Sequence, residues 1–210
     1  MFHVKHEETQ LLVDFVPNPE ALARLKIFAT LLAAWNRRIN LVSRGDLEEL
    51  WPRHIADSLQ LVPLLPEALT DAVDLGSGAG FPGLVLAIAT GIPFSLIESD
   101  QRKAAFLIEA ARITEAPVRV HAVRIEAVRL APVRLVTARA LAPLPDLLAL
   151  AAPFLAPDGV ALFPKGQNAG IELTDAAAQW QMRVERFSSR TDPRASILRI
   201  SEIRRVRESP

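Results

Sequence analysis

Apolar residues follow two different periods along the chain, and the change falls near residue 70. Before it, they recur every three or four positions, which predicts one helix beginning at Pro19 and another over residues 47–61. Beyond it, short apolar runs alternate with helical stretches. We expect strands at residues 72–75, 94–98, 118–122, 133–138 and 159–164, and helices near residues 83–90, 101–113, 144–152 and 170–180. Two further strands, Arg183–Ser188 and Ile197–Val206, are expected to form an antiparallel pair.

Three alternate glycines join the first of these strands to its helix, in the run Asp74-Leu-Gly-Ser-Gly-Ala-Gly-Phe-Pro-Gly83. Glycine lets the backbone turn sharply and approach a ligand, because it has no Cβ. Pro82 suits the first turn of the helix, where an N–H would have no intrahelical partner. Strand, glycine turn and helix form the nucleotide-binding unit of open α/β sheets. We therefore expect Gly76 and Gly78 to contact a ligand.

Two carboxylates indicate which nucleotide this turn binds. Asp74 precedes the first glycine, where it would repel a pyrophosphate but suits the amino and sulfonium groups of S-adenosylmethionine. Glu98 ends the next expected strand, 22 positions after Gly76. A carboxylate at about that offset accepts hydrogen bonds from ribose hydroxyls. We expect S-adenosylmethionine as cofactor and S-adenosylhomocysteine as product.

The order of the elements indicates the fold class. Five strand–helix units followed by a hairpin predict a mostly parallel, seven-stranded, Rossmann-like α/β sheet with a C-terminal antiparallel hairpin. This is the layout of a class I S-adenosylmethionine-dependent methyltransferase rather than of a six-stranded dinucleotide fold. Pro63 and Pro66 mark the boundary with the preceding helices. We therefore divide the chain into an N-terminal helical extension, residues 1–70, and a methyltransferase domain, residues 71–210.

Composition excludes several classes of protein. Half of the 210 residues are apolar, which allows a full-sized core. The chain has no cysteine, which excludes disulfides, thiolate zinc sites and a cysteine nucleophile, and we expect no metal site. Residues 1–8 lack the apolar run of a signal peptide, and no stretch has the length of a membrane span. We expect a cytoplasmic monomer without membrane association.

The basic residues are mostly arginine and are concentrated near the C-terminus. The net charge is zero, which argues against indiscriminate nucleic-acid binding. Yet 20 of the 24 basic residues are arginine, and eight lie between Arg183 and Arg207. Arginine binds phosphate bidentately and stacks on bases. This excess indicates either an RNA-binding face or only the composition of the genome.

With these residues in view, the chain resembles the guanine-N7 methyltransferase G family of small-subunit ribosomal RNA, also called glucose-inhibited division protein B. The matching motifs are Trp35-Asn36 with Asn40-Leu41, Arg53–Leu59, Asp74–Gly83, Glu98 with Lys103–Leu107, Arg124–Glu126, Thr137–Ala140 and Lys165–Gln167. The resemblance implies methyl transfer from S-adenosylmethionine to N7 of a guanine in 16S ribosomal RNA. The partner it implies is 16S ribosomal RNA or the small ribosomal subunit. It also implies that Gly76, Phe81, Ile125, Glu126 and Arg139 contact the cofactor.

The chemistry of guanine N7 suggests what the catalytic residues must do. N7 carries an in-plane lone pair, so no general base need remove a proton before it attacks a methyl group. Catalysis then depends on alignment and on fixed electrostatics, with a donor to O6 holding the base in register. Two basic residues follow expected strands, Arg139 after the fourth and Lys165 after the fifth. We take both as catalytic candidates, with Arg139 the better placed.

The block Arg53-His54-Ile-Ala-Asp57-Ser58 has two remaining interpretations. It is not a nucleophilic triad, since its residues share one helix and triads are assembled from separate segments. It lacks the further ligands of a metal site. It is either a polar cluster that holds the N-terminal helices to the domain or an RNA-contacting face beside the pocket.

Two other functions remain open at this point. One is a methyltransferase of the same fold that acts on a small molecule. The other is a module that binds S-adenosylmethionine without transferring its methyl group. The presence of Asp74, Glu98 and Arg139 together argues against the second.

Overall fold

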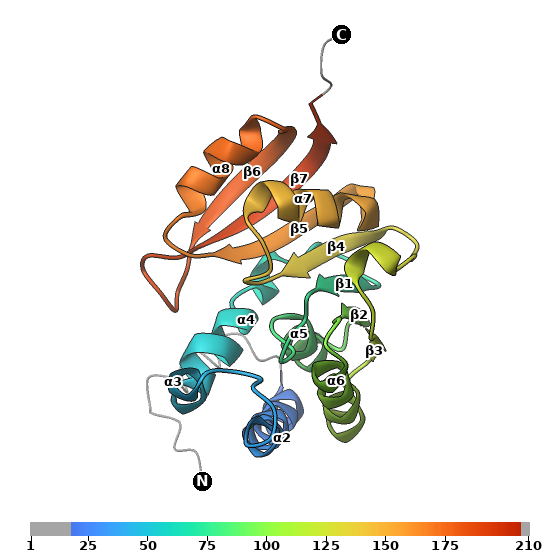
Figure 1. Cartoon of the computed structure of the whole chain (residues 1–210), viewed down its shortest axis with the longest axis vertical. Helices are drawn as coiled ribbons and strands as arrows, with labels where there is room; N and C mark the ends of the chain where they lie inside the picture. The colour runs from blue at the N-terminus through green and yellow to red at the C-terminus, as the bar shows by residue number, and fades with distance from the viewer. Residues whose placement is uncertain (1–17, 207–210) are drawn as a thin grey trace.

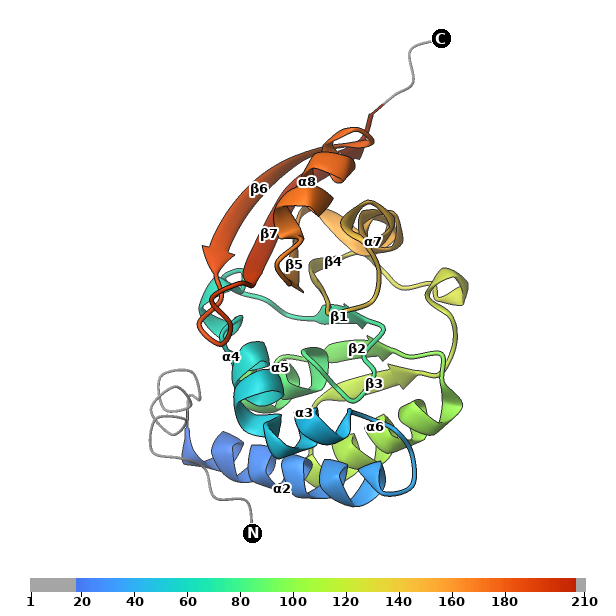
Figure 2. The ribbon, with the colours of Figure 1, turned by 60° about the vertical axis from the view of Figure 1, so that its left-hand side comes forward.

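The computed structural model of the chain describes residues 18–206, and the predictions made for residues 1–8 and for Arg207 lie outside this range. Seven strands form one sheet in the order β3-β2-β1-β4-β5-β7-β6, with helices on both faces (Figures 1 and 2). The strands are β1 (Ala72–Leu75), β2 (Phe94–Ile97), β3 (Val118–His121), β4 (Val133–Ala138), β5 (Leu155–Lys165), β6 (Trp180–Ser188) and β7 (Ser196–Arg205).

Strand directions confirm the expected fold class. The pairs from β3 to β5 are parallel, and β7 pairs antiparallel with both β5 and β6. The helices are α2 (Pro19–Asn36), α3 (Arg44–Glu48), η1 (Trp51–Ala56), α4 (Asp57–Leu59), η2 (Val62–Leu64), α5 (Gly83–Thr90), α6 (Gln101–Thr114), η3 (Ile125–Ala127), α7 (Leu144–Ala151), η4 (Ala152–Phe154) and α8 (Ala169–Ala177). Within residues 18–206, no helix is both long and apolar enough to cross a bilayer.

Two hydrophobic clusters lie on opposite faces of the sheet. The first joins α2, α5 and α6, with Phe28 and Phe106 among its fully buried members. The second joins α7 and α8 to the other face, where Phe163 is fully buried. Helix α2 packs against α5 and α6, so the N-terminal helices share a core with the sheet. The division of the chain at residue 70 stays a prediction.

The second N-terminal helix differs from the expectation. Instead of one helix over residues 47–61, the chain forms α3, the π-helix η1 and the short α4. The Ser43 side chain caps α3 by accepting from the Asp46 N–H at 3.1 Å. Pro52 lies at the start of η1, and a proline has no N–H to donate to the preceding turn. The regular hydrogen-bond pattern therefore cannot continue through this segment.

Two strands begin earlier than expected. Strand β5 starts at Leu155 rather than near residue 159, and its pairing with β4 shifts register between Val133 and Leu135. Gly159, where the strand was expected to begin, lies inside β5 next to this irregularity. Strand β6 begins at Trp180, where the sequence predicted the end of a helix. The Trp180 indole is buried and donates to the Pro145 carbonyl at 3.2 Å.

The strand order determines where a site can form. Strands β1 and β4 are neighbours, although two strands lie between them in sequence. Their register aligns Asp74 with Thr137 and Leu75 with Ala138. The glycine turn after β1 and the loop after β4 therefore leave the sheet side by side. Ligands of open α/β sheets bind at such a switch point.

Candidate active site

The glycine turn after β1 has the backbone conformation that its sequence predicts. Gly76 has φ +64° and Gly78 has φ +56°, in the region where residues with a Cβ are strained. A Cβ on Gly78 would meet nothing closer than the Gly76 carbonyl oxygen at 3.8 Å. A Cβ on Gly76 would lie 2.7 Å from Leu141 Cδ1. Gly78 thus leaves open space for a ligand, and Gly76 is covered by the loop after β4.

Asp74 lies beneath the turn rather than on its surface. It is fully buried, and Thr137 Oγ1 donates to its Oδ1 at 2.6 Å. Its Oδ2 has no hydrogen-bond partner among the described residues. Burial raises the pKa of Asp74 to about 6, although the neighbouring Thr137 and Ser77 side chains and the Gly83 N–H oppose this shift. Direct contact of Asp74 with a cofactor stays a prediction, and its observed contacts hold β1, β4 and the turn together.

Glu98 follows β2 and accepts a hydrogen bond from the backbone of the same turn. Its Oε2 accepts the Gly78 N–H at 2.8 Å, and its Oε1 accepts the Asp100 N–H at 2.7 Å. A carboxylate has about four acceptor positions, so two stay available for hydroxyl groups. Glu98 is 8% exposed, and as the residue after β2 it lies at the sheet edge where ligands of open α/β sheets bind. This arrangement suits a carboxylate that binds a ribose.

The residues present fit S-adenosylmethionine. Gly78 leaves room for a ligand, and Glu98 is fixed by two backbone N–H groups with acceptor positions to spare. Ile125 and Glu126 lie on η3 after β3, next to β2 in the sheet. Their role in binding is untested. Within residues 18–206, no group of acidic and histidine side chains is arranged to hold a metal ion.

Arg139, directly after β4, is held by the N-terminal helices. Its Nη1 donates to Asp57 Oδ2 at 3.1 Å and to the Arg53 carbonyl at 3.2 Å. Its Nη2 lies 2.7 Å from His54 Nδ1. The guanidinium carbon also lies 5.0 Å from the centre of the Phe81 ring. The motif that the sequence left with two interpretations thus forms a polar cluster around Arg139.

Lys165, at the end of β5, is also engaged. Its Nζ donates to Glu172 Oε2 at 2.7 Å and to the Ala142 carbonyl at 2.8 Å. Glu172 Oε2 also accepts the Leu144 N–H at 2.8 Å. The Lys165–Glu172 pair thereby fixes the far end of the short loop that follows Arg139, where α7 begins. In this arrangement Lys165 positions a loop, and its assignment as catalytic stays a prediction.

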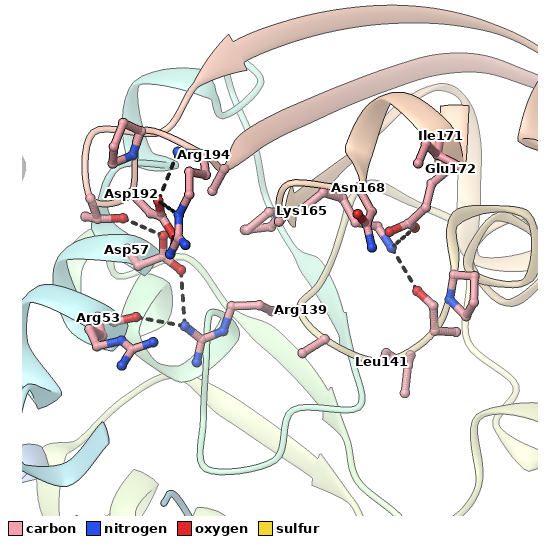
Figure 3. A pocket seen from close by; sticks show the side chains of 18 of the residues that line it. Arg53, Asp57, Arg139, Leu141, Lys165, Asn168, Ile171, Glu172, Asp192 and Arg194 are labelled. Carbon is pink, nitrogen blue, oxygen red and sulfur yellow. Dashed lines mark hydrogen bonds and ion pairs between the residues drawn. The ribbon is translucent and has the colours of Figure 1, made fainter. Parts of the chain in front are cut away.

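A cavity of about 980 Å³ lies between these two ion pairs (Figure 3). Arg139 and Lys165 line opposite parts of it, and their charged groups turn toward Asp57 and Glu172 respectively. The rest of the lining comes from η1, the loop after β4, the start of α8 and the β6–β7 turn. Leu141 lines the cavity and also covers Gly76, so its side chain lies between the cavity and the glycine turn. This volume accommodates a nucleotide-sized acceptor.

The conserved-family profile described as rRNA small subunit methyltransferase G matches residues 21–195. The chain belongs to this family. Ribosomal RNA small subunit methyltransferase G of Granulibacter bethesdensis is 54% identical over 98% of this chain and 100% of its own length. The protein of the same name from Gluconobacter oxydans is 58% identical over 89% of this chain and 96% of its own. The protein is accordingly an S-adenosylmethionine-dependent methyltransferase.

Solved structures show the same fold at low sequence identity. An O-methyltransferase from Bacillus cereus in complex with SAH has a TM-score of 0.61 at 11% identity, covering 95% of this chain and 98% of that one. A ribosomal protein L11 methylase from Lactobacillus delbrueckii subsp. bulgaricus has a TM-score of 0.56 at 17% identity, covering 71% of this chain and 78% of that one. These likenesses support the class I methyltransferase fold alone.

Sequence reasoning missed Glu172, which binds Lys165. Asp57 belongs to the block that was left with two interpretations, and it binds Arg139. Thr137 belongs to the motif Thr137–Ala140, and it binds the buried Asp74. None of these contacts was predicted, because each depends on how separate elements dock at the sheet edge.

Proposed function

We propose that this protein transfers a methyl group from S-adenosylmethionine to N7 of a guanine in 16S ribosomal RNA. The observation that carries the proposal is the 980 Å³ cavity, with Arg139 on its wall beside the glycine turn. The relatives named for small-subunit ribosomal RNA support the choice of substrate. The substrate is 16S ribosomal RNA, free or within the small ribosomal subunit, and the enzyme acts as a cytoplasmic monomer.

The cofactor side of the site is the glycine turn with Glu98. When bound, S-adenosylmethionine supplies an electrophilic methyl group on a positively charged sulfur. Gly78 leaves room for it, and Glu98 accepts hydrogen bonds from its ribose hydroxyls. Phe81, Ile125 and Glu126 are the further contacts that membership of the family implies.

The acceptor side is the cavity. A guanine there exposes its N7 lone pair without any proton having to leave first, so the protein acts mainly by alignment and fixed charge. The guanidinium of Arg139 offers several N–H donors in one plane, and those left over from the contacts with the N-terminal helices can bind guanine O6. Lys165 and Glu172 keep the loop after β4 in place. The base is thereby held in register with the methyl group.

RNA contacts extend beyond the cavity through exposed arginines on its rim. Arg53 and Arg194 both line the cavity and are well exposed, at 59% and 74% of their side chains. They come from η1 and the β6–β7 turn, which lie on the same side of the cavity (Figure 3). Both form ion pairs at the surface, Arg53 with Asp46 and Arg194 with Asp192, whereas Arg199 of β7 pairs with Glu185 and is only 29% exposed. We therefore assign phosphate binding to the rim rather than to the whole C-terminal arginine excess.

Single-turnover methylation of unmethylated small subunits by Arg139→Ala tests the assignment. Loss of the base-positioning donor should lower the rate by about 100-fold, the scale of a 1 Å positioning error. Arg134→Ala is the matched control, because Arg134 lies on the same strand and pairs with Asp158 away from the cavity. A rate for Arg139→Ala within about twofold of the control would remove Arg139 from the active site.

A further inference from the structure

The segment η1–α4 holds the Arg139 guanidinium at the wall of the cavity. Three acceptors come from this one segment: the Arg53 carbonyl, His54 Nδ1 and Asp57 Oδ2. We call these the Arg139 clamp. Arg139 is 18% exposed, so these bonds form in a largely desolvated place. Charge-assisted hydrogen bonds there fix the orientation of the guanidinium plane.

The His54 contact requires a neutral imidazole. An arginine can only donate, so the 2.7 Å contact from Arg139 Nη2 requires an unprotonated His54 Nδ1. Burial lowers the pKa of His54 to about 4, and the Arg139 charge adds to this shift. The carboxylates of Asp46 and Asp57 oppose it, and Arg53 acts in the same direction as Arg139. His54 is therefore neutral and can accept at physiological pH.

Phe81 connects the clamp to the glycine turn. Its ring stacks on His54 with centroids 4.9 Å apart and 20° between the planes. Arg139 lies against the same ring. Phe81 follows directly after the last glycine of the turn. The contacts of His54 with Phe81 and Arg139 therefore join the cofactor side of the site to the acceptor side.

Asp57 is itself held by residues other than Arg139. Its Oδ1 accepts from Gln60 Nε2 at 2.7 Å and from Thr191 Oγ1 at 2.8 Å, which leaves Oδ2 for Arg139. Gln60 Oε1 accepts the Arg190 N–H at 2.8 Å. The β6–β7 turn thus braces the carboxylate that holds Arg139.

We propose that His54 and Asp57 are positioning residues for methyl transfer, which hold the Arg139 guanidinium in the orientation that binds the acceptor base. The N-terminal extension then completes the active site rather than only covering the sheet. This inference rests on the role of Arg139 under the proposed function. A purely structural role for the same contacts would lower stability and leave the rate of the folded enzyme unchanged.

The variants separate the hydrogen bonds from packing and charge. Asp57→Asn keeps Oδ1 but places a donor opposite Arg139. His54→Phe keeps the stacked ring and removes the acceptor, whereas His54→Asn offers an amide oxygen near the position of Nδ1. Asp158→Asn is the control, since it breaks the Asp158–Arg134 pair between β5 and β4, at the other end of β4 from Arg139. Urea unfolding shows which variants are folded at the assay temperature.

Single-turnover rates are measured for each variant with and without Arg139→Ala, and calorimetry gives the affinity for S-adenosylmethionine. We expect Asp57→Asn and His54→Phe to lower the rate about 10- to 100-fold. Neither should lower it further in the Arg139→Ala background, because residues that act through one group are not additive. His54→Asn should recover most of the rate, and cofactor affinity should stay within about threefold of wild type in all of them.

Several results would overturn the inference. If Arg139→Ala is slow but folded Asp57→Asn and His54→Phe react at the control rate, the clamp does not position Arg139. Additive losses, or a matching loss of cofactor affinity, would show that these residues act elsewhere. If Arg139→Ala itself reacts at the wild-type rate, the proposed role of Arg139 fails first, and the inference fails with it. If Asp57→Asn does not fold, the comparison of His54→Phe with His54→Asn tests the inference by itself.

Discussion

Replacement of Gly83 by alanine tests how Asp74 is packed under the glycine turn. Gly83 is the first residue of α5, and its backbone has no unusual φ. A Cβ there would lie 2.5 Å from Asp74 Cβ and 2.7 Å from both Cγ and Oδ2. Carbon atoms pack best about 3.5–4.0 Å apart, so the added methyl overlaps Asp74 by about 1 Å.

Neither partner in this contact can move away without disturbing other buried contacts. Asp74 belongs to the buried strand β1 and is held by Thr137 on β4, and Gly83 is fixed by the start of a buried helix. Overpacking of a tight core costs about 1–3 kcal/mol of stability. We expect the upper end of this range, because the clash involves the Cβ of Asp74, which cannot move without the buried strand β1. We expect Gly83→Ala to lower stability by about 3 kcal/mol, which is about 6–12 °C in Tm for a chain of this size.

Gly170→Ala is the matched control. Gly170 is the second residue of α8, and a Cβ there would meet nothing within 4 Å. Alanine in a helix is favoured over glycine by about 0.5–1 kcal/mol, so this variant should be slightly more stable than wild type. The same chemical change should therefore have opposite signs at two helix starts.

Urea unfolding at pH 7.5 measures both variants, with the midpoint and the slope fitted separately so that a change in compactness is not mistaken for a change in stability. A Gly83→Ala protein as stable as wild type would show that Asp74 does not lie against the start of α5. Equal destabilisation by Gly170→Ala would show that the glycine effect is general rather than a clash with Asp74.

Three further outcomes follow from the site. Glu98→Ala should weaken S-adenosylmethionine binding by about 1–3 kcal/mol in calorimetry, because the cofactor loses a charged acceptor and the Gly78 N–H loses its partner. Unchanged affinity would exclude Glu98 from the cofactor site. The raised pKa of Asp74, about 6, means that the stabilising contribution of the protonated carboxyl is present below about pH 4 and is lost as the pH rises through 6. Relative to wild type, Asp74→Asn should therefore gain about 3 kcal/mol of stability between pH 4 and pH 8 in urea unfolding. An equal stability difference at both pH values would contradict the shift. RNA affinity should fall by about 7-fold between 50 and 200 mM salt if the two rim arginines, Arg53 and Arg194, contact phosphate, with a shallower slope for Arg53→Gln and an unchanged one for the α6 control Arg112→Gln.

The sheet could be predicted from the sequence because each inner strand is a short buried run with a clear end. The bounds of β1 and β4 agree with the prediction, and both lie at the centre of the sheet. The early starts of β5 and β6 could not be predicted in the same way. The sequence predicted a strand only from residue 159 and a helix over residues 170–180, and pairing with neighbouring strands extends β5 and β6 beyond those bounds.

The components of the site could be named from the sequence, but not their contacts. The strand ends identified Asp74, Glu98 and Arg139, because the topology of a parallel sheet places such residues at one edge. The pairing of Arg139 with Asp57 spans 82 positions, and nothing local indicates it. The expected helix is also broken at Pro52 into η1 and α4, and residues of these two short helices contact Arg139. Such docking depends on side-chain packing across the whole N-terminal extension.

The central claim is that this protein methylates a guanine of 16S ribosomal RNA at N7. Mass spectrometry of 16S ribosomal RNA fragments from cells with and without the gene tests it directly. We predict that one 7-methylguanine disappears on deletion, returns with the wild-type gene, and does not return with Arg139→Ala. An unchanged set of 7-methylguanines, or the loss of a methyl group from a different base or atom, would contradict the account.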